Sequence, residues 1–256
     1  AALKELFDEH GSRLAAGVME PTNTELPAPR YLQGVRDLTL DHEALLIFDE
    51  VVTGFRLARG GAQEAFGVTP DLACLGKAMG NGMPLSALVG KREILEVIPR
   101  TGYGMTFRGE MLSLAAAHAC LQIIRDEPVT EHLAAIGGAL RDGFAAACHR
   151  AGVPGELAGP AARMTLSFAP AGGITPLGLQ TLLIQECLSR GVMTNGLVLP
   201  CWAHDDEAVA TTLRAFDESV EVLARAIESG GVRDLLHMPA IRFYPGDEAL
   251  EEGDAT

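Results

Sequence analysis

An aspartate and a lysine stand at the ends of two apolar runs and are the residues best placed to do chemistry. Residues 45–48 form a short continuous apolar run, as in a strand buried on both faces of a parallel sheet, and Asp49 follows it. A second run, residues 71–75, leads within two positions to Lys77. Open α/β sheets bind ligands at the carboxyl ends of their strands. The pattern therefore predicts a carboxylate and an amine at comparable strand ends.

These are the two groups that pyridoxal phosphate requires from a protein. Desolvation disfavours the charged form of an amine in an apolar, glycine-lined site, and a neutral amine can form a Schiff base with a carbonyl. A carboxylate that is not paired with that amine could keep a heteroaromatic nitrogen protonated, which makes the ring an electron sink. We therefore expect Lys77 and Asp49 to be buried near each other.

Several segments, in order, resemble the signature of class III pyridoxal-phosphate aminotransferases, in the branch similar to glutamate-1-semialdehyde aminomutase. They are DEVVTGFR (residues 49–56), GVTPDL (residues 67–72) and LGK (residues 75–77) with Gly80 and Gly82. The resemblance implies the α/β fold of the aspartate aminotransferase-like transferases (PLP-dependent fold type I), here a partial large domain followed by a small α+β domain. It also implies a transaminase or 2,1-aminomutase acting on a small amine or amino acid.

The resemblance assigns roles to individual residues. Lys77 would hold the cofactor as a Schiff base and later move a proton between substrate and cofactor, and Asp49 would pair with the pyridine nitrogen. Val51, on the same strand face as Asp49, would pack against the ring. Thr106, in the segment GMTFRGE, would bind the cofactor phosphate of the neighbouring subunit, which implies a homodimer. Glu25 is expected to be a further cofactor contact, with a solvated loop as the alternative.

The resemblance also predicts the domain organisation. Residues 1–138 would be the C-terminal half of the cofactor-binding large domain, residues 139–245 a small α+β domain, and residues 246–256 an acidic mobile tail. The family's N-terminal half, which carries a phosphate-binding turn and an aromatic residue stacked on the ring, is not matched. Either the chain is a fragment of a longer enzyme, which we favour, or another chain supplies the remainder.

Hydrophobic periodicity predicts the other elements. Helices are expected over residues 2–10, 31–42, 91–97, 111–126, 130–151, 177–189 and 206–227, and strands over residues 15–20, 84–90, 164–168 and 192–199. The helix over residues 111–126 is apolar nearly all round, so we expect it to be buried, with His118 as an interior hydrogen-bonded histidine. Lys91 is expected to be solvated and His204 to be structural. Asp205 or Asp206 should cap the last helix.

Composition narrows the classes of function. A net charge of −14 argues against nucleic acid and anionic membrane surfaces as partners, while 48% apolar residues are ample for a core. We find no apolar stretch near the roughly 20 residues that span a bilayer, and no secretory signal. The five cysteines are scattered without a CxxC pair, as is typical of reduced thiols. We therefore expect a cytoplasmic protein.

Three functions are alternatives to a pyridoxal-phosphate enzyme. Residues 45–50 also resemble the Walker B strand of an ATPase, with Glu50 positioning water, but the GxxxxGK[ST] loop that such an enzyme needs is absent from the sequence. A metal enzyme is disfavoured because the seven histidines form no HExxH or His/Cys cluster. The third reading is a non-catalytic interaction domain or fragment, which would bind no cofactor.

Overall fold

The computed structural model describes residues 2–102 and 109–237, and the chain divides into two compact units, Ala1–Glu131 and His132–Thr256. The division falls in the long helix α6 (Val129–Ala151), which also contains the boundary after residue 138 expected from the sequence. That assignment of domains stays a prediction. Each unit is described by itself.

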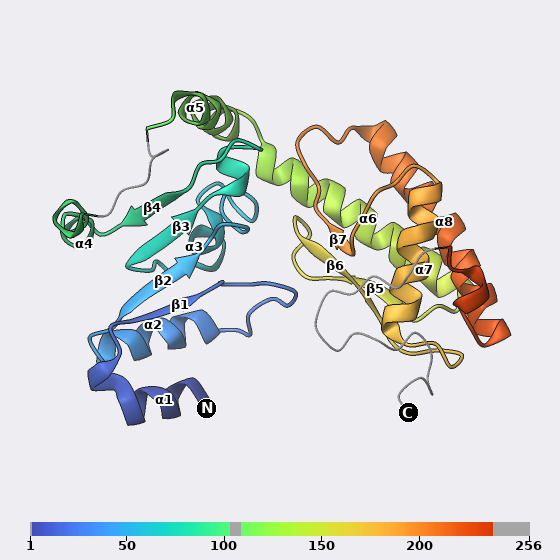
Figure 1. Cartoon of the computed structure of the whole chain (residues 1–256), viewed down its shortest axis with the longest axis horizontal. Coiled ribbons are helices and arrows are strands. Elements are labelled where there is room, and N and C mark those ends of the chain that lie inside the picture. The colour runs from blue at the N-terminus through green and yellow to red at the C-terminus, as the bar shows by residue number, and fades with distance from the viewer. Residues whose placement is uncertain (1, 103–108, 238–256) are drawn as a thin grey trace. The chain divides into compact units, whose positions relative to one another are not determined.

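A four-stranded sheet forms the centre of the first unit (Figure 1). The strands β1 (Ala16–Met19), β2 (Leu45–Asp49) and β3 (Leu72–Leu75) are parallel, and β4 (Ala87–Gly90) is antiparallel to β3. The order is β1-β2-β3-β4, with Asp49 opposite Cys74 and Leu75 opposite Ala87. The carboxyl ends of three parallel strands therefore meet at one edge of the sheet.

One face of the sheet carries the small core of this unit. Leu46 and Phe48 of β2 are 0% exposed and pack with Leu32 and Val35 of α2 (Tyr31–Asp41). The other residues of β2 are only half-buried, because among the described residues α2 covers a single face. The prediction of a strand buried on both faces is wrong for this chain.

Most of the other helices of the first unit are short. The remaining elements are α1 (Ala2–His10), η1 (Gly11–Arg13), α3 (Gly61–Phe66), η2 (Lys77–Met79), α4 (Arg92–Leu95), η3 (Ile98–Thr101) and α5 (Met111–Asp126). The predicted helices at α1, α2 and α5 are confirmed, whereas α3 was not predicted because six residues are too few to show a helical period.

The burial of α5 contradicts the sequence-based expectations. The helix α5 buries only Ser113, Ala117 and Ile124, and Met111 is 75% exposed, so its predicted burial is wrong. His118 is exposed as well, not interior. An all-round apolar helix is buried only where other elements surround it, and here α5 packs on η2 along one narrow stripe.

The second unit is an α+β arrangement with its own core. Its sheet has the order β5 (Gly155–Ala158), β6 (Met164–Phe168), β7 (Leu197–Val198), all antiparallel. Its other helices are α7 (Pro176–Ser189), α8 (Asp206–Ser229) and η4 (Arg233–Leu235). Phe144 lies in the centre of the core, with ring centroids 6.3 Å from Phe168 and 5.1 Å from Phe216.

Predictions for this unit are largely confirmed. Asp205 caps α8 by accepting a 2.8 Å hydrogen bond from the amide of Ala208. The strand expected over residues 192–199 shrinks to β7. Gly196 has a φ of +94°, a left-handed conformation that interrupts an extended chain just before β7.

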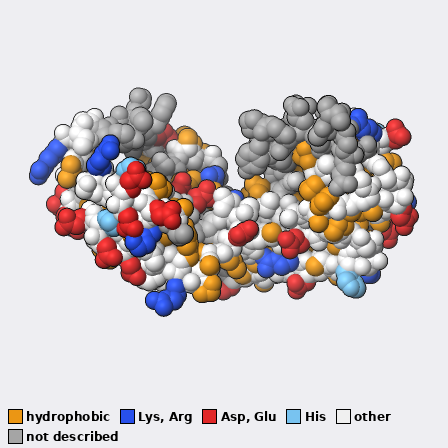
Figure 2. Space-filling model, turned by 90° about the horizontal axis from the view of Figure 1, so that it is seen from below, with side chains coloured by type: hydrophobic (Ala, Val, Ile, Leu, Met, Phe, Trp, Pro, Cys, Tyr) orange, Lys and Arg blue, Asp and Glu red, His pale blue; other side chains and the backbone are white. Residues whose placement is uncertain are grey.

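The surface matches the acidic composition. In the view of Figure 2, Asp and Glu side chains are scattered over the presented face, interspersed with hydrophobic ones. Within the described ranges, every helix is too short or too polar to cross a bilayer.

Candidate active site

Asp49 is the last residue of β2 and is half-buried. Its Oδ1 accepts a 3.0 Å hydrogen bond from the amide of Val51, and it makes no ion pair with the residues that the structure describes. Cys74 lies directly opposite on β3. Burial, together with the charge of Asp49, raises the pKa of the Cys74 thiol. The carboxylate is therefore held by its own turn rather than by a cation.

Lys77 follows β3 after Gly76 and opens the single turn η2. Its φ of +40° is unusual for a residue other than glycine, and its carbonyl accepts hydrogen bonds from the amides of Gly80 (3.1 Å) and Asn81 (2.8 Å). Such strained conformations cost about 1–3 kcal/mol and cluster at functional sites. The lysine therefore stands on a turn whose conformation is maintained by specific hydrogen bonds.

Lys77 is exposed, so the expectation that it would be buried is wrong for this chain. The turn η2 buries Met79 (5% exposed) instead, where it packs with α5. No ion pair joins Lys77 to any residue in the described part of the chain. Within the described residues, therefore, no ion pair would have to break before this amine could bind a cofactor.

Val51 lies beside the backbone that carries Lys77. A Cβ placed on Gly76 would be 3.4 Å from Cγ1 of Val51. Close by, a Cβ placed on Gly54 would be 2.8 Å from Cδ2 of Leu75. The loop after β2 therefore packs against the last two residues before Lys77, which places the predicted residues Asp49, Val51 and Lys77 at one end of the sheet.

Glu25 belongs to the loop that follows β1, at the same edge of the sheet. Its side chain is exposed, while its carbonyl accepts a 2.6 Å hydrogen bond from the hydroxyl of Thr22, which is 4% exposed. The structure brings the loop to the correct edge but shows no hydrogen bond between the Glu25 carboxylate and the other predicted residues. Thr106 lies outside the described residues.

Sequence reasoning missed the role of Glu50, which it considered only as the glutamate of an ATPase. Glu50 is 0% exposed, and its carboxylate accepts hydrogen bonds from the Thr53 hydroxyl (3.1 Å) and from the amides of Ala62 (2.5 Å) and Gln63 (3.2 Å). A glutamate enclosed in this way cannot position a water for hydrolysis. The Gly60-Gly61 pair, which allows a close approach just before α3, was the available signal.

The donors present at this edge fit pyridoxal phosphate. The cofactor needs an amine for its aldehyde and a carboxylate for its ring nitrogen. Asp49 ends β2, and Lys77 follows β3, the adjacent parallel strand. Neither residue is paired with an opposite charge among the described residues. By contrast, the described residues hold no group of three His, Cys, Asp or Glu side chains placed to bind a metal.

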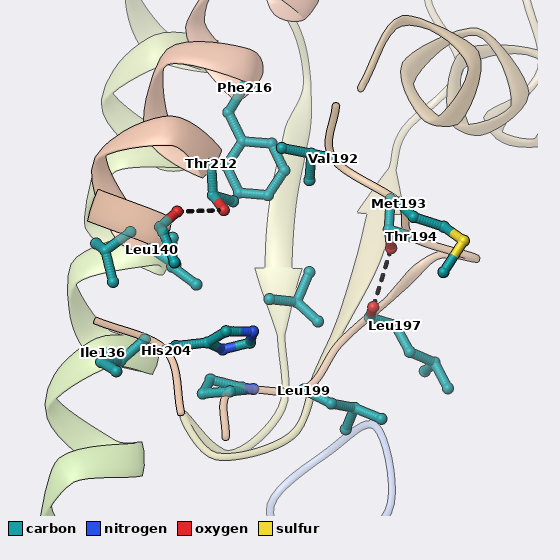
Figure 3. Close-up of a pocket in the computed structure, with 14 residues that line it drawn as sticks. Ile136, Leu140, Val192, Met193, Thr194, Leu197, Leu199, His204, Thr212 and Phe216 are labelled. Atoms are coloured by element: carbon teal, nitrogen blue, oxygen red, sulfur yellow. Dashed lines mark hydrogen bonds between the residues drawn. The ribbon is translucent and has the colours of Figure 1, made fainter. Parts of the chain in front are cut away.

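A separate hollow in the second unit lacks such chemistry. This cavity, of about 290 Å³, is lined mainly by apolar side chains such as Leu140 and Phe216 (Figure 3). The Thr194 and Thr212 hydroxyls donate to backbone carbonyls, each at 2.9 Å. The Nδ1 of His204 accepts a 3.2 Å hydrogen bond from the amide of Cys201, in agreement with its predicted structural role.

Comparison with known proteins defines the class. Residues 1–219 match the model of the class-III aminotransferase family (Aminotransferase class-III), and the chain belongs to this family. Its curated relatives include a glutamate-1-semialdehyde 2,1-aminomutase from Rhodopirellula baltica, 37% identical over 211 residues, which are 78% of this chain and 48% of the relative. Another, from Thermomicrobium roseum, is 33% identical over 242 residues, 88% of this chain and 56% of the relative. The chain thus spans about half the length of these relatives.

Solved structures agree with the fold. The structure described as the PLP internal aldimine form of the FumI protein from Sphingopyxis sp. MTA144 superposes with a TM-score of 0.82 at 30% identity, covering 89% of this chain and 56% of that one. An acetylornithine aminotransferase from Elizabethkingia anophelis gives a TM-score of 0.76 at 25% identity, covering 86% of this chain and 60% of that one. The predicted PLP-dependent transferase fold type I is confirmed.

Proposed function

We propose that this chain is part of a pyridoxal-phosphate-dependent enzyme that moves amino groups, a class III transaminase or a 2,1-aminomutase acting on a small amine or amino acid. The observation that carries the proposal is the placement of Asp49 and Lys77 at the carboxyl ends of adjacent parallel strands, each without an opposite charge among the described residues. Membership of the family and the similarity to aminomutases support it.

Each predicted residue at the sheet edge would make a different contact with the cofactor. Lys77 would hold the cofactor covalently through its Nζ, and Asp49 would accept a hydrogen bond from the ring nitrogen while its Oδ1 stays bound to the amide of Val51. The side chain of Val51 would pack against the ring. When bound, pyridoxal phosphate supplies an aldehyde that accepts amino groups and a ring that delocalises negative charge.

In this proposal Lys77 transfers the proton. The Nζ of Lys77 would take a proton from the substrate α-carbon and return it at another position, as a general base and then a general acid. The exposure of the side chain leaves it free to swing between these positions. The carboxylate of Asp49 would lie beside the ring nitrogen.

The remaining roles are also proposals. We propose a cytoplasmic homodimer in which Thr106 contacts the cofactor phosphate of the neighbouring subunit and Glu25 makes a further cofactor contact. The position of the Glu25 loop at the sheet edge supports the second contact. The five cysteines, all free in the structure, support a reducing compartment.

The proposal is tested by trapping the cofactor. Pyridoxal phosphate is added to the purified chain, the visible spectrum is recorded before and after borohydride, and the reduced peptide is identified by mass spectrometry. We expect the label on Lys77 in the wild type and in a Lys4→Ala control, which removes another exposed lysine, and no label at that position in Lys77→Ala. A wild-type chain that takes no label would favour the non-catalytic reading.

A further inference from the structure

The buried carboxylate of Glu50 binds together both ends of the loop that follows β2. Besides the Thr53 hydroxyl and the two amides at the start of α3, it accepts a 3.0 Å hydrogen bond from the Nε2 of Gln63. Burying a carboxylate is costly unless hydrogen bonds satisfy it, and this one is 0% exposed. These bonds therefore tie Thr53 to the start of α3 across the loop over residues 51–60.

Glycine at position 61 makes this arrangement possible. Gly61 has a φ of +77°, which favours glycine, and a Cβ at this position would overlap the carboxylate of Glu50. The close approach of the backbone lets the amides of Ala62 and Gln63 reach the carboxylate. The close approach at Gly61 and the hydrogen bonds to the Glu50 carboxylate therefore depend on each other.

The same loop also contacts the strand end that carries Lys77. The amide of Gly54 donates a 2.9 Å hydrogen bond to the carbonyl of Glu50. Gly54 lies so close to Leu75 that a Cβ on it would be 2.8 Å from Cδ2 of that leucine, and Val51 lies against Gly76. A continuous set of contacts thus leads from Glu50 through the loop to the two residues before Lys77.

We propose that Glu50 is a positioning residue for the candidate site, fixing the 51–60 loop so that Val51 and Gly54 hold the backbone next to Lys77 in place. Glu50 itself touches neither substrate nor cofactor, because its carboxylate is enclosed by the loop and α3. The consequence for the cofactor rests on the proposed function, whereas the consequence for residues 75–77 does not.

Hydrogen exchange tests the structural part without any cofactor. In Glu50→Gln the new amide group faces N–H donors, so we expect amides in residues 51–60 and 75–81 to exchange at least tenfold faster. The matched control is Glu64→Gln on α3, since among the described residues the Glu64 carboxylate accepts a hydrogen bond only from the amide of Gly60, at 2.5 Å. In the control the change should stay within residues 60–64. Unchanged exchange at residues 75–81 in Glu50→Gln overturns the proposal.

A milder variant keeps the test decisive if Glu50→Gln does not fold. Gln63→Met removes the side-chain donor at 3.0 Å and leaves the backbone donors in place. We expect the same pattern with a smaller increase, about threefold at residues 75–81, while peptides from β1 and β6 keep wild-type exchange. An increase confined to α3 would show that Glu50 only stabilises that helix.

Cofactor trapping tests the consequence for the site. The concentration of pyridoxal phosphate that half-labels Lys77 should rise about tenfold in Glu50→Gln and stay within twofold of wild type in Glu64→Gln. A role limited to stability would lower the melting temperature and leave this concentration unchanged, which would overturn the positioning role. If the wild type takes no label, the proposed function fails, and the exchange measurement still decides the role of Glu50.

Discussion

Replacing Asp71 by asparagine should destabilise the first unit strongly, because this carboxylate binds residues of α2 and β2 and Lys91, just after β4. Asp71 accepts hydrogen bonds from the guanidinium of Arg36 at 2.5 and 3.1 Å and from the amide of Leu46 at 2.8 Å. The ammonium of Lys91 lies 2.7 Å away. Lys91 is exposed, as the sequence analysis expected, and it also forms an ion pair with Asp71 that the sequence did not indicate.

The size of the effect follows from the exposure of each partner. The side chains of Asp71 and Arg36 are 4% and 13% exposed, so the variant leaves a nearly buried guanidinium without its carboxylate. Breaking such a pair costs about 3–5 kcal/mol. We expect about 3 kcal/mol, because asparagine still accepts from the Leu46 amide. Lys91 is 46% exposed, and water screens its charge, so Lys91→Met should cost only about 0.5–1 kcal/mol.

Amide hydrogen exchange in peptides covering residues 44–50 measures this effect in the first unit alone. A loss of about 3 kcal/mol corresponds to exchange roughly 100-fold faster where opening is rapid and reversible. The matched control is Asp41→Asn, an exposed aspartate at the end of α2, which should change the free energy of opening by less than about 0.5 kcal/mol. Equal effects in Asp71→Asn and the control would refute the reasoning.

The pH dependence gives a second check on Asp71. Burial alone would raise its pKa, but the hydrogen bonds from Arg36, Lys91 and the Leu46 amide hold the pKa well below its usual range. A carboxyl with a lowered folded-state pKa stabilises the fold above the unfolded value of about 3.9 and loses that contribution as the pH falls below it. The difference between wild type and Asp71→Asn should therefore narrow below about pH 4. A difference that stays constant down to pH 2 would contradict this account.

Two further predictions concern the second unit. Burial raises the pKa of the Cys148 and Cys187 thiols to about 11, so at pH 8 a thiol reagent should modify exposed Cys201 first and these two only after unfolding, as counted by mass spectrometry. Rapid native-state labelling of Cys187 would contradict the burial. Asp205→Ala should cost about 1 kcal/mol in urea unfolding because the Ala208 amide loses its cap, whereas Asp205→Asn should cost less than half of that.

Much of the local structure could be predicted because it depends on neighbouring residues. The helices α1, α5 and α8 begin at the predicted residues, since their apolar period and the Asp205 cap are local features. The strand β6 was predicted at its observed bounds for the same reason. The order of charged residues after apolar runs also placed Asp49 and Lys77 at strand ends.

Burial and charge pairing could not be predicted, because they depend on residues distant in the sequence. The apolar pattern of α5 indicates a helix but does not say what surrounds it, and its Met111 is 75% exposed. Lys91 has a polar sequence context, yet its partner Asp71 is reached only when β4 folds back antiparallel to β3. Lys77 is exposed since its turn buries Met79 instead.

By itself, then, the sequence determined the chemical groups of the candidate site and the family to which the chain belongs, because residue types and their spacing are local information. Only the tertiary structure decided which groups face one another. It enclosed the carboxylate of Glu50 against α3 and placed Val51 beside Gly76. Such contacts require a close approach of backbones, which a linear pattern does not record.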